Sequence, residues 1–455
     1  MTMEMVRGLK FCLHFSIANM ALVTIAMSDS LRPLGRHTPP TGTLRVTGEF
    51  PDPFVFYSFF VKPGEPLLMK NVLTAENFPA YAKWNDEYMR EKYGEEEVQV
   101  EHGKKENRSE KYYEFTLSRF LSIYNKSNLY MVHDIPKRMS GDVYLPSSLQ
   151  CGGFEKSLDF SVVWFSSGET KSVLHYDGAD NINCLLDGRK EFVLIDKKHK
   201  DLVERDGFEK DGTFSTVDVE KVDLDKFPGL KEAPWYEVNM TKGDCLFIPF
   251  KWYHHVRSLP GRNLAVNHWF FHLWWFNNSD CERAYSEGPL ESRPLLQFTK
   301  ASELELVRSQ FLSIFEDKSS ISAVEFLEVV RCPRASGIKM FKYLDVDKDH
   351  KLEWEELYRF KMEDVMETFH DCIPTLLPSS AYDNNRQSND IRDEDDNSDK
   401  EDLDLSNNAN IQDLKDSGDA NVVLESADKY SMRIEKYSEA VVEEADPKDD
   451  SHDEL

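Results

Sequence analysis

Apolar and β-branched residues come in short runs through the middle of the chain, and Gly and Asp residues separate these runs. Short runs bounded by turn residues predict short β-strands. A succession of such strands is typical of a double-sheet jelly roll, whose mouth can hold a small ligand. The clearest strands are predicted at residues 159–165, 183–186, 192–195, 245–248 and 264–271.

The segments around these strands have other patterns. Helices are predicted at residues 78–93 and 117–121, with a strand between them at 98–101. Residues 201–235 are charged and weakly periodic, so we interpret them as an insertion between barrel strands, where substrate choice is commonly decided. Residues 269–276 include six aromatics. Core packing is favoured for them over a substrate-facing wall or a dimer surface.

Beyond residue 295 the spacing of apolar residues becomes helical. We therefore expect a helical module at residues 295–375, followed by a polar tail. Residues 381–455 hold 24 Asp and Glu against 8 Lys and Arg. Low hydrophobicity with high net charge predicts disorder for residues 379–455, although residues 421–442 could form a short helix.

Length and charge bound the function. A chain of 455 residues suggests two folded modules plus extra segments. The net charge of −27 argues against nucleic-acid binding, which needs clustered Lys and Arg. No uncharged apolar run long enough to span a membrane follows the N-terminus, so we expect no membrane span once a signal is removed.

Both ends of the sequence indicate the lumen of the endoplasmic reticulum. Residues 1–28 have a basic start at Arg7 and Lys10, an apolar centre, and small residues near a possible cleavage point. This pattern predicts a secretory signal, with an uncleaved anchor as the alternative. The last four residues, 452–455, are HDEL, the address that the retrieval receptor of this compartment binds.

Sequons and cysteines agree with this compartment. Six of the seven cysteines remain after the signal. Cys184 and Cys245 lie in predicted strands, and we interpret them as buried thiols, whereas Cys332 and Cys372 could bridge the helical module. N-glycosylation sequons occur at Asn107, Asn125, Asn239 and Asn277.

The candidate chemistry begins with His175 and Asp177, which are two residues apart. On a β-strand such residues point to the same face. His254, which follows a strand ending at Pro249, could complete a set of two nitrogens and one oxygen. This set suits non-haem Fe(II), because the opposite face of the metal stays open. A surface His beside an exposed Asp is the alternative for the His-x-Asp pair alone.

Lys190 adds a second signal. It opens a predicted buried strand after the turn at Asp187 and Gly188. A buried ammonium group is costly unless an anion accompanies it. We therefore expect an anionic ligand in the barrel near Lys190.

With these residues in place, the sequence between residues 50 and 277 resembles the jumonji-C (JmjC) 2-oxoglutarate oxygenases. The similarity is greatest to the small protein hydroxylases related to the asparaginyl hydroxylase of the hypoxia pathway. It implies a mainly β double-stranded β-helix, the cupin fold, with flanking helices. The oxygenase domain would span residues 45–277, with an α+β extension at 45–150 and the barrel at 151–277.

The resemblance also implies roles for particular residues. His175, Asp177 and His254 match the iron ligands, and Fe(II), 2-oxoglutarate and O₂ would be the cofactor and co-substrates. The expected 2-oxoglutarate contacts are Lys190, Ser172 and Tyr130 at the distal carboxylate, with Asn181 and Asn267 nearby.

Residues 345–356 have the spacing of an EF-hand calcium loop. His350 occupies the position where Gly normally adopts positive φ, so the expected affinity for Ca²⁺ is lowered. Residues 315–322 lack the carboxylate pattern of such a loop and would form a calcium-free partner loop. For residues 345–356, a plain acidic loop beside a helix is the alternative. The predicted ligands are Asp345, Asp347, Asp349, the carbonyl of Lys351, and Glu356.

The leading hypothesis is a luminal oxygenase that hydroxylates a side chain of a protein or peptide substrate. Demethylation is the less favoured reaction. The rival, from another class, is a non-catalytic calcium-binding scaffold that uses the barrel for binding. Gating of catalysis by Ca²⁺ is a third hypothesis, for which the sequence offers no residue-level support.

Overall fold

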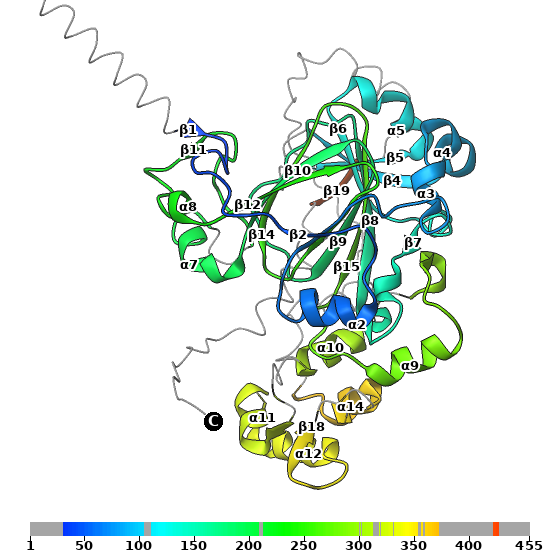
Figure 1. Ribbon diagram of the computed structural model, residues 1–455. Coiled ribbons are helices and arrows are strands. Elements are labelled where there is room, and N and C mark those ends of the chain that lie inside the picture. The colour runs from blue at the N-terminus through cyan, green and yellow to red at the C-terminus, as the bar shows by residue number, and fades with distance from the viewer. Residues whose placement is uncertain are drawn as a thin grey trace, which may run out of the picture.

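The computed structural model contains a β-sheet body with helices around it and a smaller helical unit beside it (Figure 1). The predicted signal, Asn107, part of the partner loop and the HDEL end lie outside the described residues. The structure describes residues 31–103, 111–208, 213–299, 301, 303–312, 318, 320–330, 332–353, 356–357, 360–372 and 422–426.

Two sheets face each other and form the predicted jelly roll. The smaller sheet has the order β12-β10-β14, and the larger one has β8-β15-β9-β13 at its centre. Leu185 and Leu246 of the large sheet share a buried cluster with Phe192 of the small sheet. The strands are β8 (Leu158–Ser166), β9 (Asp180–Asp187), β10 (Arg189–Ile195), β12 (Tyr236–Thr241), β13 (Cys245–Ile248), β14 (Tyr253–Ser258) and β15 (Asn263–Phe270).

The central strands are apolar on both faces because both faces are covered. Every residue of β15 is buried. One face meets the small sheet, and the other packs against the helices of the N-terminal extension in the main core. Strand β13 has the predicted bounds and ends before Pro249, which has no amide hydrogen to continue the ladder.

The N-terminal extension continues the large sheet beyond β8. Its strands follow in the order β6-β4-β5 on one side, and β3-β2 lie beyond β13 on the other. The extension consists of β2 (Arg45–Thr47), α2 (Pro53–Phe56), η1 (Tyr57–Val61), β3 (Leu67–Met69), α3 (Pro79–Lys83), α4 (Asp86–Tyr93), β4 (Glu97–His102), β5 (Lys111–Thr116), α5 (Leu117–Ile123), η2 (Tyr124–Lys126), β6 (Leu129–Asp134), β7 (Tyr144–Leu145) and η3 (Ser147–Leu149).

The single helix predicted at residues 78–93 is wrong, because the structure has two helices there. Helix α3 ends at Lys83, and the Asn85 side chain accepts a hydrogen bond from the Tyr88 amide to begin α4. Asn is a strong N-cap residue, so a new helix starts where the apolar spacing alone suggests continuation.

The insertion lies between β10 and β12, as predicted. Its apolar residues form a separate cluster with Leu174, Ile195 and Tyr253 of the barrel. The N-terminal strand β1 (Leu31–Arg32) pairs with the insertion. The elements of the insertion are η4 (Lys197–His199), α7 (Lys200–Val203), β11 (Val222–Asp223) and α8 (Gly229–Glu232).

The interpretation of Cys184 and Cys245 as thiols is wrong, because they form a disulfide. The two residues lie directly opposite each other in the antiparallel pair β9–β13, with Cα atoms 4.1 Å apart. Directly opposed residues are close enough for a bridge. Cys332–Cys372 is a disulfide in the helical unit, and Cys151–Cys281 is a third that the sequence analysis missed.

The C-terminal helical unit has its own core, which includes Phe311, Phe326 and Phe341. Its two short strands are antiparallel, with Ile321 opposite Leu352. Helix α6 (Phe154–Ser157) precedes β8 on the barrel. The elements that lead to and form the helical unit are α9 (Asn278–Ser286), β16 (Arg293–Pro294), η5 (Leu295–Gln297), α10 (Glu303–Leu312), β17 (Ser320–Ser322), α11 (Ala323–Val329), α12 (Arg334–Leu344), β18 (Lys351–Glu353) and α14 (Met362–Thr368).

Of the tail, only β19 (Val422–Ser426) is described, and it pairs antiparallel with β5. A helix was the expectation around this position, whereas these five residues form a strand. The predicted disorder of the remaining tail concerns residues outside the described part. No helix in the described residues is both long and apolar enough to cross a membrane.

Candidate functional site

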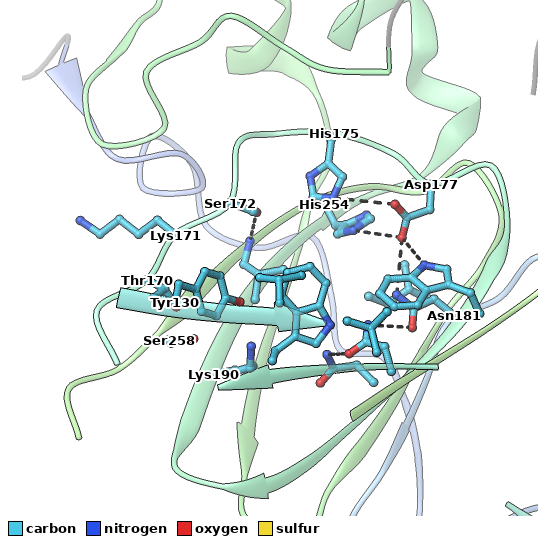
Figure 2. Close-up of a pocket in the computed structure, with 18 of the residues that line it drawn as sticks. Tyr130, Thr170, Lys171, Ser172, His175, Asp177, Asn181, Lys190, His254 and Ser258 are labelled. Atoms are coloured by element: carbon cyan, nitrogen blue, oxygen red, sulfur yellow. Dashed lines mark hydrogen bonds and ion pairs between the residues drawn. The ribbon is translucent and has the colours of Figure 1, made fainter. Parts of the chain in front are cut away.

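The candidate site is a cavity of about 150 Å³ between the two sheets. Side chains from β8, β9, β10, β14 and β15 line it, together with residues 170–177 and the face of β4–β6. Figure 2 shows His175, Asp177 and His254 gathered on one side, with Lys190, Tyr130, Thr170 and Ser258 toward the other. The cavity therefore has a cluster of metal-ligand types and a separate cationic group.

His175, Asp177 and His254 converge in this cavity. The ligand-type atoms of the three side chains all lie within 4.8 Å of one another. Nε2 of His175 is 3.9 Å from Oδ1 of Asp177, and Nε2 of His254 is 3.7 Å from Oδ2. Two imidazoles and one carboxylate at these separations can hold one metal ion on a single face.

The expected regular strand at His175 and Asp177 is wrong. The segment pairs with β14 through isolated bridges, Lys171 to Arg257 and His175 to His254. The segment bends away after His175, and the Asp177 carbonyl accepts a hydrogen bond from the Lys251 amide. The two ligands thus converge through a turn held by β14 and by the residues before it, and not through strand alternation.

Both histidines have the tautomer that a metal requires. Nδ1 of His175 lies 3.0 Å from the Val173 carbonyl, and Nδ1 of His254 lies 2.9 Å from the Trp252 carbonyl. A carbonyl can only accept, so Nδ1 carries the proton in each ring. Each Nε2 is therefore the ring nitrogen left for a metal, and it lies on the side of Asp177.

Asp177 is buried yet surrounded by groups that favour its charged form. Burial raises the pKa of this carboxyl. Positive charge on His254 and His175 lowers the pKa, and so do the hydrogen bonds that Trp269 and Asn181 donate. The net shift is downward. Oδ2 accepts from Nε1 of Trp269 at 3.1 Å and from Nδ2 of Asn181 at 3.5 Å. The carboxylate is thus available as an anionic ligand.

Three asparagines form a hydrogen-bonded row behind Asp177. Asn183 donates to Asn267 at 2.5 Å, and Asn267 donates to Asn181 at 2.9 Å. Asn181 in turn donates to Asp177. Asn181 and Asn267, which the sequence analysis placed near a co-substrate, line the cavity and orient the carboxylate, and Asn183 was missed.

Lys190 lies inside the barrel, as its position in the strand suggests. Lys190 is 3% exposed, and burial lowers the pKa of its ammonium group to about 8. Among the described residues, none forms an ion pair or hydrogen bond with its ammonium group. An unpaired buried cation at a cavity wall is the counterpart that a carboxylate ligand such as 2-oxoglutarate requires.

Ser172 lines the cavity, and its hydroxyl also has partners within the protein. Its hydroxyl accepts from the Val256 amide at 2.9 Å and donates to the Val173 carbonyl at 2.9 Å. The hydroxyl therefore holds the backbone of two segments together. Thr170 and Ser258, which the sequence analysis missed, lie with Tyr130 near Lys190 (Figure 2).

Ser258 lies directly opposite Lys190 in the pairing of β14 with β10. Because this pairing joins strands far apart in the sequence, no local pattern could have identified Ser258. Thr170 could have been found, because it is two residues before Ser172 and would share its face in an extended segment.

An aromatic wall completes the cavity. Trp269 stacks with Phe160 at 5.0 Å between ring centroids, and Trp164 lies 6.1 Å from Trp269. Core packing is the expectation for residues 269–276, and Trp269 is buried in a hydrophobic cluster with Phe160 while it also lines the cavity. Nε1 of Trp164 is buried, and no acceptor in the described part of the chain bonds to it. The wall is therefore apolar and carries one free donor.

The acidic loop of the helical unit is a second cluster of metal-ligand types. Carboxylate oxygens of Asp345, Asp347 and Asp349 lie within 4.8 Å of one another. Asp345 is 5% exposed, and none of the described residues forms a hydrogen bond with its Oδ1. His350 adopts a φ of 68°, the positive value expected for this position of the loop.

Glu356 is folded back onto this loop. Its Oε1 accepts from the Val346 amide at 2.7 Å, and its Oε2 accepts from the Glu353 amide at 3.0 Å. Lys351 donates its amide to Asp349. The carboxylate at the twelfth position is thus already held near the three aspartates.

The three described sequons differ in accessibility. Asn125 and Asn239 are exposed, whereas Asn277 is half-buried and its side chain accepts from the Asp280 amide to cap α9. Asn277 is therefore the least suitable of the three asparagines for attachment of a glycan.

Comparisons with known proteins agree with this geometry. Residues 53–273 match the model of the cupin-like domain. The lysine-specific demethylase JMJ30 of Arabidopsis thaliana is 29% identical over 50% of this chain and 53% of its own. Lysine-specific demethylase 8 of Xenopus tropicalis is 28% identical over 47% and 50%.

The human bifunctional peptidase and (3S)-lysyl hydroxylase JMJD7 is 24% identical over 48% of this chain and 81% of its own. The chain spans about half the length of the first two relatives. Residues 53–273 are therefore similar to a cupin-like domain, and the proteins that this part of the chain resembles include JmjC demethylases and a lysyl hydroxylase.

Proposed function

We propose that this protein is an Fe(II)- and 2-oxoglutarate-dependent oxygenase of the endoplasmic reticulum lumen that hydroxylates a protein side chain. The observation that carries the proposal is the unpaired ammonium of Lys190 in the same cavity as the His175, Asp177 and His254 cluster. A metal-ligand face and a buried cation in one cavity match the two ends of a keto-acid co-substrate.

The residues of the chain have distinct roles in this proposal. His175, Asp177 and His254 would hold Fe(II), while Lys190 would pair with the distal carboxylate of 2-oxoglutarate. Together with O₂, the bound iron and keto acid would supply the oxidising chemistry. Asn181 and Asn267 keep Asp177 oriented, and the wall of Trp269, Trp164 and Phe160 keeps water away from the reacting atoms.

Hydroxylation is favoured over demethylation because of the proposed compartment, where histone substrates are absent. The homologues include proteins named for each reaction. The substrate in this proposal is a protein or peptide of the secretory pathway.

The luminal location rests on the apolar N-terminus and the final HDEL, which the retrieval receptor would bind. Three disulfides among the described residues support an oxidising compartment, since such bonds are rare in the cytosol. Expression of the full chain with and without its last four residues tests this proposal. Retention in both forms, or entry of neither form into the secretory pathway, would contradict it.

A calcium ion in the loop of residues 345–356 is a second proposed function. The buried, unpartnered Oδ1 of Asp345, beside two further carboxylates, supports it. Asp345, Asp347, Asp349, the carbonyl of Lys351 and Glu356 would supply oxygen ligands, as Ca²⁺ prefers.

Binding of 2-oxoglutarate to the purified chain tests the oxygenase proposal. Mn²⁺ replaces iron, and saturating Ca²⁺ keeps Mn²⁺ out of the acidic loop. We expect saturable binding that is lost in His175→Ala and Lys190→Ala and kept in the control Lys231→Ala, an exposed residue of α8. No binding by the unmodified chain would reject the oxygenase and leave the calcium-binding scaffold as the better account.

A further inference from the structure

Arg308 lies where the helical unit meets the barrel. It is on α10, is 7% exposed, and its Nε donates to Glu305 at 2.9 Å. Its Nη1 donates to the backbone carbonyl of Leu357 at 2.7 Å. Leu357 directly follows Glu356, the twelfth residue of the acidic loop. A shift of Glu356 onto a bound cation would therefore act on the carbonyl that Arg308 holds.

Helix α10 also contacts the barrel. Arg308 and Leu312 line a cavity of about 40 Å³ together with His272 and Trp275, which follow β15. Helix α10 packs against α6, and the Ala301 amide before it donates to the Leu158 carbonyl at the start of β8. Trp275 packs against the core of the helical unit. The two units thus share side chains at this cavity.

His272 connects this cavity to the oxygenase site. Its Nδ1 lies 2.8 Å from Oδ2 of Asp180, which is fully buried. The other oxygen of Asp180 accepts from the Phe250 amide at 2.8 Å. The ring of Phe250 stacks on His272 at 5.4 Å between centroids. The His272–Asp180 pair therefore anchors the turn at residues 249–252.

That turn positions two of the three proposed iron ligands. The Lys251 amide donates to the Asp177 carbonyl at 3.0 Å. The Trp252 carbonyl accepts from Nδ1 of His254 at 2.9 Å. Contacts thus run from the residue after Glu356 to Arg308, which lines the same small cavity as His272, and from His272 to the supports of Asp177 and His254.

From these contacts we infer that Ca²⁺ bound by the loop of residues 345–356 tightens 2-oxoglutarate binding in the barrel, with Arg308 as the linking residue. The inference rests on the proposed oxygenase site and the proposed calcium site. Without a cation, three adjacent carboxylates repel one another and loosen the chain at Leu357. A bound cation removes this repulsion and holds α10 firmly against the segment that supports the iron ligands. Such coupling is reciprocal, because it is a free energy shared by the two sites.

The test uses the full chain, stripped of metals and reloaded with Fe(II) under anaerobic conditions. The dissociation constant of 2-oxoglutarate is measured by calorimetry with and without added Ca²⁺. We expect binding about fivefold tighter or more with Ca²⁺. The affinity for Ca²⁺, measured with and without 2-oxoglutarate, must change by the same factor.

Variants locate the coupling. In Glu356→Gln, which weakens the calcium site, the 2-oxoglutarate affinity should no longer respond to Ca²⁺. In Arg308→Met both ligands should still bind, but the ratio of the 2-oxoglutarate affinity with Ca²⁺ to that without Ca²⁺ should fall toward one. The control Arg334→Met removes an exposed arginine of α12 and should keep the full ratio. If Arg308→Met does not fold, Arg308→Lys serves in its place, since it keeps the charge and loses the planar donor geometry.

The outcomes separate the inference from the proposals beneath it. Equal 2-oxoglutarate affinity with and without Ca²⁺, or weaker binding with Ca²⁺, overturns the coupling and leaves both sites intact. Absence of 2-oxoglutarate binding in every state rejects the oxygenase function, and the coupling with it. If Ca²⁺ tightens 2-oxoglutarate binding in Arg308→Met as much as in the unmodified chain, Arg308 is not the linking residue.

Discussion

The indole Nε1 of Trp269 donates a hydrogen bond to Oδ2 of Asp177 over 3.1 Å. Asp177 lies in an irregular turn, whereas Trp269 is near the end of β15, one of the fully buried strands. The indole therefore fixes a carboxylate whose own segment is not part of a regular strand. Hydrogen bonds of this kind orient metal ligands and tune their affinity.

Trp269→Phe should weaken metal binding at the site by about tenfold, because groups that orient a ligand typically contribute this much. The ring remains to fill the wall, so folding should be preserved. Titration with Fe(II) under anaerobic conditions measures the effect. Trp164→Phe is the matched control, since Nε1 of Trp164 has no partner to lose. Equal losses in the two variants would assign the effect to the wall and not to the hydrogen bond.

Lys190→Met should stabilise the protein in the absence of ligand while removing 2-oxoglutarate binding. The pKa of Lys190 falls to about 8 because the charged form is desolvated without a partner. This lowering of the pKa from its usual 10.5 corresponds to a loss of roughly 3 kcal/mol in the free energy of unfolding at neutral pH. Urea unfolding of the ligand-free variant at pH 7 measures it. A less stable variant would show that the ammonium has a stabilising partner.

Affinity for 2-oxoglutarate should fall as the pH rises above about 8. Below this pH the free protein already holds a protonated Lys190, whereas above it binding must take up a proton. The expected slope is about tenfold per pH unit while the complex remains protonated. The ligand-free protein should gain stability over the range from about 8 to 10.5, because the unfolded chain then binds more protons.

Replacement of Cys184 and Cys245 by Ala together should lower the free energy of unfolding by about 2–4 kcal/mol. The bond closes a loop between residues that are 61 positions apart, so it restricts the unfolded chain. Denaturant titration of the double variant checks this value. Unchanged stability would mean that the strand ladder alone holds β9 beside β13.

Ca²⁺ should raise the melting temperature of the full chain, because a ligand that binds only the folded state stabilises it by mass action. Glu356→Gln should lose this response, since a carboxylate that holds the loop closed becomes neutral. Glu363→Gln, in the first turn of α14, is the matched control because it removes the same charge outside the loop. A response that survives Glu356→Gln would place the cation elsewhere.

Much of the barrel could be predicted from the sequence, because strand alternation and turn residues act over a few positions. Each predicted strand overlaps an observed one, and β13 has the predicted bounds. Lys190 and the three iron-ligand candidates were identified by residue type and spacing, and the structure brings all four into one cavity. The error at residues 78–93 came from Asn85, whose capping side chain outweighs the helical spacing around it.

The sequence by itself determined the chemical groups of the site and the order of strands that carry them, since these depend on neighbours along the chain. Tertiary structure alone decided which distant residues meet. Trp269 reaches Asp177, Ser258 lies opposite Lys190, and Cys184 bonds to Cys245 only because of how the strands pair and face one another. Strand register is set by burial across the whole sheet, and no short stretch of sequence contains that information.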